Sequence, residues 1–165
     1  MADWGNFYTL LGTVAGTLIG LLFVVITFSS DRKIEGDEHR VRFFVTPLLV
    51  YFATLLLLSL ALAAPIEDRF RALTLGILGC AGLAYVTNLA MTSRRRNDVQ
   101  DHEVVWDVVL PITAYILIAV AATAWALSAT FADAIAAIAA IVLLIAAIRK
   151  SWLVTLSIAG RRKRK

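Results

Sequence analysis

The stretch FYTLLGTVAGTLIGLLFVVITF, residues 7–28, decides the fold because it contains no charged side chain over its whole length. A helix needs about 20 apolar residues to cross the roughly 30 Å hydrocarbon core of a membrane. Lipid offers no partner for backbone N–H and C=O groups, so a spanning segment must be a continuous helix. The sequence therefore predicts an all-α membrane protein in which five transmembrane helices form a compact bundle. The other four runs have no Lys, Arg or Glu in their interiors and cover residues 43–64, 72–91, 108–128 and 131–148.

Basic side chains are concentrated in alternate linkers between these runs. Fourteen of the sixteen Lys and Arg residues fall in residues 29–42, in residues 92–107 or after residue 148. Linkers rich in Lys and Arg stay in the cytosol, so we expect the N-terminus outside and the C-terminus in the cytosol. Five crossings, an odd number, satisfy this orientation. The protein is expected to be an integral, multipass component of a bacterial inner (plasma) membrane.

The predicted membrane segments use up most of the 165 residues, of which 60% are hydrophobic. We expect a single transmembrane domain, residues 1–165, that ends in an interfacial and basic tail, residues 151–165. No length remains for a soluble catalytic or nucleic-acid-binding domain, so neither enzyme activity nor a cofactor nor a nucleic-acid partner is expected. Within the tail, the apolar residues 151–160 are predicted either to extend the fifth helix or to lie along the inner leaflet.

Membrane lipids are the partners that the charge distribution predicts. Each basic residue next to the inner leaflet contributes about 1 kcal/mol towards binding anionic headgroups. Tryptophans near the predicted helix ends, at positions 4, 106, 125 and 152, are interpreted as interfacial anchors. The lipid-facing basic cluster of the tail consists of Arg161, Arg162, Lys163, Arg164 and Lys165.

Glycine recurs at every fourth position in the first predicted helix. Residues four apart lie over one another on a helix, and a row of glycines lets another helix approach closely. A row of threonines, also spaced by four, runs beside it. Three interpretations stay open: packing within one chain, contact between identical subunits, and lining of a pore by hydroxyl groups. The two rows are Gly12, Gly16 and Gly20, and Thr9, Thr13 and Thr17.

A second row of small residues lies in the third predicted helix and contains Gly76 and Cys80, between Ala72 and Ala84. We expect it to pack against the first helix, within a subunit or between subunits. Asn88 is the most polar side chain well inside any predicted helix. It is expected to face protein or water, either in an interhelical hydrogen bond or in a conduction path.

Carboxylates and imidazoles occur together in two linkers on the predicted cytosolic side. These residue types bind divalent cations when they converge, so Glu38, His39, Asp101 and His102 are weak candidates for a metal site. The spacing within either linker is not that of a known metal motif. Salt-bridged, solvated loops are the simpler interpretation, and no metal is expected.

These patterns favour a homo-oligomeric passive channel for ions or small solutes, with the glycine and threonine rows of the first helix at the interface or the pore. A non-conducting accessory or scaffold subunit that binds other transmembrane helices is the alternative. A cytosolic sensor of divalent ions or pH is a weaker alternative. The helix interiors contain no Lys, Arg or Glu, which argues against proton-coupled transport.

Overall fold

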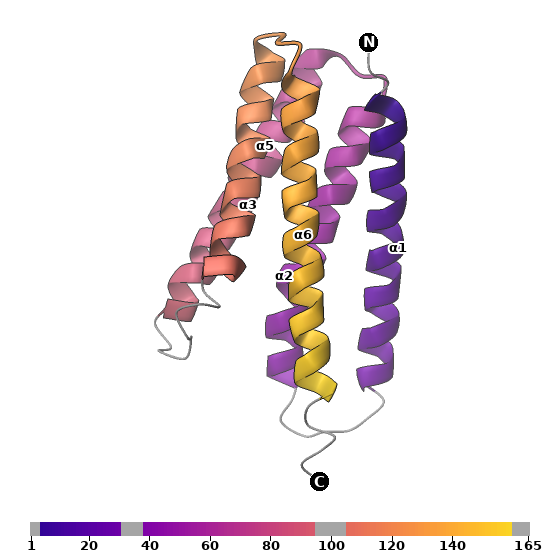
Figure 1. Ribbon diagram of the computed structural model, residues 1–165, viewed down its shortest axis with the longest axis vertical. Coiled ribbons are helices and arrows are strands. Elements are labelled where there is room, and N and C mark those ends of the chain that lie inside the picture. Colours follow the sequence, from indigo (N-terminus) through magenta and orange to yellow (C-terminus); the bar gives the residue numbers. More distant parts are fainter. Residues whose placement is uncertain (1–3, 31–37, 95–104, 160–165) are drawn as a thin grey trace.

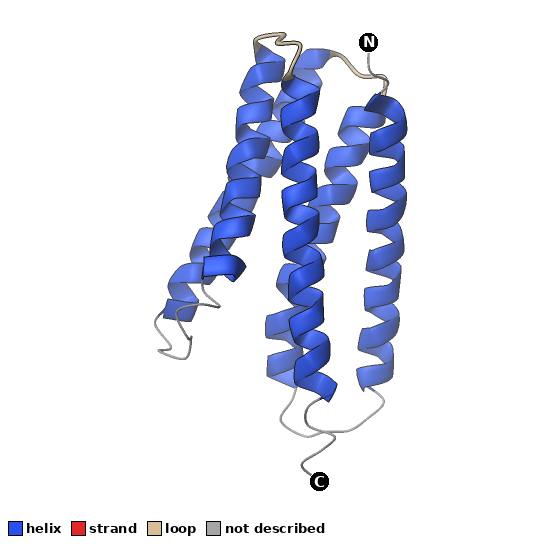
Figure 2. Ribbon diagram, in the orientation of Figure 1, coloured by secondary structure: helices blue, strands red, loops and turns tan. Residues whose placement is uncertain are grey.

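The computed structural model describes residues 4–30, 38–94 and 105–159, and the regular structure in these ranges is entirely helical (Figure 2). The prediction of an all-helical chain is confirmed. Figure 1 shows the helices side by side in a bundle. The five α-helices are α1 (Trp4–Ser30), α2 (Glu38–Ala63), α3 (Asp68–Arg94), α5 (Leu110–Ala126) and α6 (Ala132–Ala159), and a π-helical turn, η1 (Val105–Val109), leads into α5.

Four of these helices, α1, α2, α3 and α6, are long and apolar enough to cross a membrane. The fourth predicted segment, residues 108–128, is realised differently, because α5 alone has only 17 residues. Pro111 stands in the first turn of α5, where its missing N–H costs little. Upstream of it the backbone continues in the wider π-helical geometry of η1.

Successive helices run in opposite directions, so the bundle has two distinct ends (Figure 1). We call the end where α1 begins the N-terminal end and the end where α6 stops the C-terminal end. The short connections 64–67 and 127–131 both lie at the N-terminal end. Residues 151–159 continue α6 as a helix.

Packing within the bundle is uneven. Helix α5 packs closely on both α3 and α6, whereas α1 packs mainly on α2. Alanine dominates the buried side of α6, at positions such as Ala136, Ala139 and Ala140, so neighbouring helices can approach it closely.

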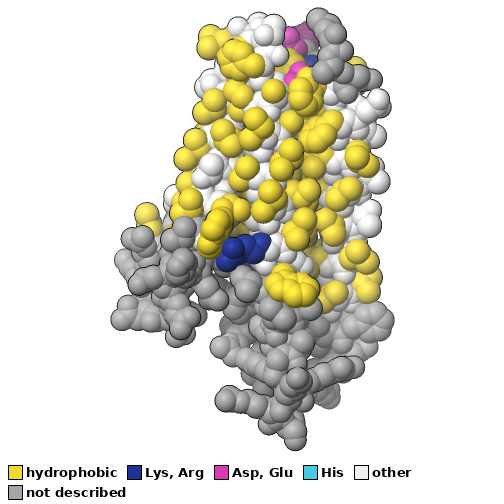
Figure 3. Space-filling model, in the orientation of Figure 1, with side chains coloured by type: hydrophobic (Ala, Val, Ile, Leu, Met, Phe, Trp, Pro, Cys, Tyr) yellow, Lys and Arg dark blue, Asp and Glu magenta, His cyan; other side chains and the backbone are white. Residues whose placement is uncertain are grey.

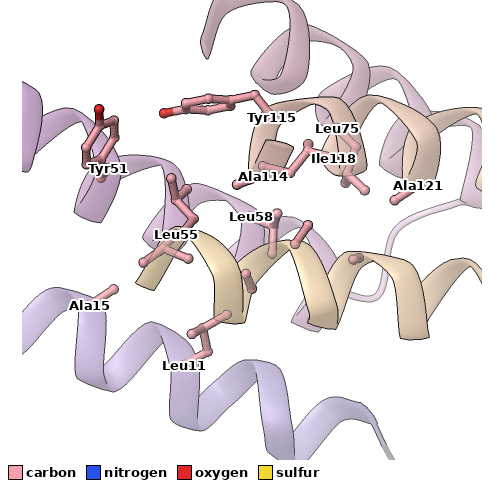
Figure 4. Packing of buried hydrophobic residues seen from close by; sticks show 14 of the residues in the cluster. Leu11, Ala15, Tyr51, Leu55, Leu58, Leu75, Ala114, Tyr115, Ile118 and Ala121 are labelled. Atoms are coloured by element: carbon pink, nitrogen blue, oxygen red, sulfur yellow. The ribbon is translucent and has the colours of Figure 1, made fainter. Parts of the chain in front are cut away.

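The core between the helices is filled with large apolar side chains (Figure 4). Leu55, Leu58, Ile118 and Leu143 are completely buried. The ring of Tyr115 extends from α5 towards α2 in the same region. In a membrane, where lipid is as apolar as leucine, such a core would be held together mainly by close packing and by a few polar contacts.

Candidate functional site: the open face of α1 and the two ends of the bundle

Helix α1 is the least embedded of the four long helices. Only 11% of its most apolar window is buried, compared with 56% for α2. Its contact with the rest of the chain follows one face, on which Tyr8, Leu11 and Ala15 are buried. The Tyr8 hydroxyl also donates a hydrogen bond of 2.8 Å to the backbone carbonyl of Asp133. This bond ties α1 to α6 at the N-terminal end.

The three glycines of the predicted row on α1, Gly12, Gly16 and Gly20, have different surroundings. A Cβ atom at Gly12 would lie 2.6 Å from Ser59 Oγ of α2, so this glycine permits a close approach inside the chain. A Cβ atom at Gly16 or Gly20 would meet nothing within 4 Å. The row predicted from the sequence is therefore divided, and only its first member serves packing within the chain.

The three threonines of the predicted row on α1, Thr9, Thr13 and Thr17, are all exposed. Each hydroxyl donates to the carbonyl four residues earlier, on Gly5, Thr9 or Thr13, at 2.8–2.9 Å. Their hydrogens are thus used within the helix, while the oxygen atoms remain on an exposed surface. We call the set Thr9, Thr13, Thr17, Gly16 and Gly20 the open face of α1.

The small residues of α3 do serve packing, but in a different row and with a different helix. A Cβ atom at Gly79 would lie 3.0 Å from the backbone nitrogen of Ala119 on α5, and one at Gly82 would overlap the ring of Tyr115. Leu75 and Val86 are buried in the same row. Contact between the helices thus follows the spacing 75, 79, 82, 86, which alternates four and three residues and keeps to one side of a 3.6-residue helix.

The row that the sequence suggested on α3 turns away from this contact. Gly76 is half-buried, and a Cβ atom there would lie 3.9 Å from that of Ala122 on α5, while Cys80 and Ala84 are exposed. A constant spacing of four drifts around the helix by about 40° per step. Within one chain, the expected pairing of this row with α1 is therefore replaced by packing of α3 on α5.

Asn88 is exposed on α3. It does not face the core of the described chain, and its predicted contact with protein or water stays a prediction. A buried polar pair elsewhere was not predicted from the sequence. Thr54 Oγ1 of α2 donates to the Val50 carbonyl at 2.8 Å, so the hydroxyl of Tyr115, 3.1 Å from Thr54 Oγ1, is the donor between the two helices. The sequence signal for this pair was the presence of a tyrosine and a threonine within predicted apolar runs.

An arginine stacks on a tryptophan at each end of the bundle. At the N-terminal end the guanidinium carbon of Arg71 lies 5.1 Å from the ring centroid of Trp125. Arg71 also donates to the Ala64 carbonyl at 2.9 Å and pairs with Asp68 at 3.5 Å. These contacts join α3 and its preceding loop to the end of α5.

At the C-terminal end, the guanidinium carbon of Arg149 on α6 lies 5.1 Å from the ring centroid of Trp106 on η1. The two Arg–Trp pairs thus have the same stacking distance. They differ in the partners of the arginine, because no carboxylate pairs with Arg149 among the residues that the structure describes.

The predicted metal ligands and the basic tail cannot be placed in the same way. The side chains of Glu38 and His39, together with Asp101, His102 and residues 161–165, lie outside the described residues. Within residues 4–30, 38–94 and 105–159, no group of three or more His, Cys, Asp or Glu side chains comes together as a metal site.

The chain matches no family model, no curated protein and no solved structure at a significant level. Its function therefore has to be inferred from the geometry of the bundle.

Proposed function

We propose that this chain is a multipass integral membrane protein whose five helices all cross the bilayer, with the N-terminal end of the bundle outside and the C-terminal end in the cytosol. Four helices meet the length requirement by themselves. Helix α5 together with η1 runs from Val105 to Ala126, which corresponds to about 30 Å at the usual rise per residue. The orientation rests on the basic residues in alternate linkers.

We further propose that the protein is a homo-oligomer assembled through the open face of α1. The observation that carries this proposal is the empty space beside Gly16 and Gly20. A glycine facing lipid gives up side-chain packing without any gain, whereas a glycine facing another helix allows close van der Waals contact. The low burial of α1 within one chain is in keeping with a helix that has a further partner.

The proposed activity is passive passage of an ion or small solute between subunits. The core of one chain is closed by the buried side chains of Leu55, Leu58 and Ile118, so the path is assigned to the space between chains. The exposed oxygens of Thr9, Thr13 and Thr17 can accept hydrogen bonds from water or replace part of the hydration of a cation. The threonine row would line the path where α1 helices from several chains meet.

A second candidate function uses the same face without conduction. The hydrogen of each threonine hydroxyl is already bonded to a carbonyl of α1, so the open face needs no water. This favours dry contact with a transmembrane helix of another protein, as in an accessory or scaffold subunit.

The test combines particle mass with flux. The purified protein is weighed in nanodiscs and then assayed for ion and solute flux in liposomes, together with Gly16→Leu and Thr13→Val. The matched control is Ala81→Leu, which enlarges an exposed small residue on α3. We expect an oligomer that conducts, a folded and silent monomer for Gly16→Leu, altered flux for Thr13→Val and no change for Ala81→Leu.

Other outcomes of this test would contradict part of the proposal. A stable oligomer that conducts nothing would contradict the channel function and support the scaffold function. A wild-type monomer, or an oligomer that persists in Gly16→Leu, would contradict assembly through the open face.

A further inference from the structure

Arg149 has an unusual environment for a charged side chain. It is half-buried on α6, and its Nε–H is buried without a hydrogen-bond partner. Its stacking on Trp106 attracts the positive charge to the ring face. Stacking on the ring does not engage the in-plane N–H donors of the guanidinium, and these have no acceptor among the described residues.

The Arg71–Trp125 pair at the N-terminal end has hydrogen-bond acceptors that Arg149 lacks among the described residues. The Nε–H of Arg71 is likewise buried without a partner, but Arg71 has the Asp68 carboxylate and the Ala64 carbonyl beside it. The acidic side chain of Asp68 disfavours a further anion at that site. No carboxylate of the described residues pairs with Arg149.

Exposed apolar side chains lie beside Arg149 on η1 and α6. Figure 3 shows one patch coloured for Lys or Arg on the lower part of a described face that is otherwise largely hydrophobic. The exposed large apolar side chains of this region come from η1 and α6 and include Trp106, Ile145, Ile148 and Trp152. A positive group bordered by exposed apolar residues complements an amphiphile that carries a negative charge.

The position of Arg149 along α6 matches the level of lipid headgroups. Sixteen residues separate Asp133 from Arg149, which is about 24 Å along a helix, close to the thickness of the hydrocarbon core. Trp106 and the exposed Trp152 lie at the same end. Tryptophan rings favour the boundary between hydrocarbon and headgroups.

We propose that Arg149, held flat on Trp106, binds the phosphate of an anionic phospholipid whose acyl chains lie against Ile145 and Ile148 of α6. A planar guanidinium can give two parallel hydrogen bonds to one phosphate, so this lipid supplies an acceptor that the described residues do not. The site rests on the proposed position of the helices in a membrane. It does not depend on oligomerisation or on conduction.

The experiment is a titration of the full-length protein in a neutral detergent with phosphatidylglycerol, followed by native mass spectrometry. We expect Arg149→Gln to weaken binding of the first lipid about tenfold, because it removes both a charge and a bidentate donor. Arg69→Gln is the matched control, since it removes an exposed arginine at the opposite end, and it should change binding less than about twofold. All variants keep the basic tail, so its contribution cancels.

Two further variants separate recognition from folding. Arg149→Lys keeps the charge without the planar donors and should give an intermediate loss. Trp106→Leu removes the stacking surface from an exposed position and should weaken binding several-fold even if Arg149→Gln does not fold. Wild-type affinity in folded Arg149→Gln, or in Trp106→Leu, would overturn the proposal.

Controls on the ligand identify the source of the phosphate. Phosphatidylcholine should bind the wild type more weakly than phosphatidylglycerol and should not distinguish it from Arg149→Gln. Inorganic phosphate at millimolar concentration should not displace the lipid, because it lacks acyl chains. Complete displacement would show a site for free anions and would overturn the lipid assignment. A purified protein that proves not to be membrane-embedded would instead contradict the proposed function.

Discussion

Helices α3 and α1 both carry glycines at spacings typical of helix contacts, but two of those on α3, and only Gly12 of the row on α1, are closed against another helix of the same chain. Gly79 and Gly82 lie directly against the backbone of Ala119 and the ring of Tyr115, whereas Gly16 and Gly20 face empty space. The comparison teaches that a glycine row allows close approach but does not specify a partner. The partner is determined by which large side chain fills the space.

On α5 that side chain is Tyr115. Its ring occupies the space that the missing side chain of Gly82 leaves, and its hydroxyl reaches Thr54 on α2. One tyrosine therefore connects α5 with helices on two sides. No comparable side chain of the described chain reaches Gly16 or Gly20, so the open face of α1 is the part of the molecule that assembly with another chain would change most.

The largest effect is expected at Gly82. A methyl group there would overlap the Tyr115 ring, so Gly82→Ala should lower the free energy of unfolding by about 3 kcal/mol through overpacking. Reversible unfolding in mixed detergent micelles measures it. Gly76→Ala is the matched control, because its new methyl would stand 3.9 Å from Ala122 Cβ, an ordinary contact. Equal stability of the two variants would show that α3 and α5 do not pack as described.

A smaller effect should distinguish two glycines of α1 itself. Under detergent conditions chosen so that the chain is monomeric, Gly12→Ala should cost about 1 kcal/mol because Ser59 must turn away and lose its hydrogen bond to the Leu56 carbonyl. Gly16→Ala should cost nothing there, since alanine favours a helix over glycine and meets no neighbour. The same unfolding assay measures both.

In nanodiscs the order of these two variants should reverse. Gly16→Ala is expected to weaken assembly, because a methyl group keeps two helices further apart, while Gly12→Ala should assemble normally. If Gly16→Ala were harmless in both conditions, the open face of α1 would face lipid and the contrast with α3 would lose its functional meaning.

The sequence predicted the helices well because lipid leaves few alternatives for a long apolar run. The predicted segments 7–28 and 72–91 lie inside α1 and α3, and the segment 43–64 ends one residue after α2 does. The chief exception, α5 with η1, arises at Pro111, where the sequence shows a proline but not the π-helical turn that precedes it.

The contacts between helices were harder to predict, because small residues occur on several sides of α1 and α3. The row containing Gly76 and Cys80 satisfied a spacing of four, but the buried row 75, 79, 82, 86 satisfied the period of the helix better and includes Gly82, which leaves room for the ring of Tyr115. Arg149 and Trp106 are 43 positions apart, so their stacking depends on the packing of η1 against α6. No local pattern could have revealed it.

The smallest effect concerns Cys80, which lies on the exposed side of α3. Cys80→Ser should change stability by less than about 0.5 kcal/mol and should leave the mass of the nanodisc complex unchanged. Oxidation of the wild type with copper phenanthroline should give no disulfide-linked dimer, because assembly is proposed to use α1. In the Cys80→Ser background, Thr13→Cys should give such a dimer. The opposite pattern, in which Cys80 forms a cross-link and a cysteine at position 13 does not, would show that the subunit interface is on α3 and not on α1.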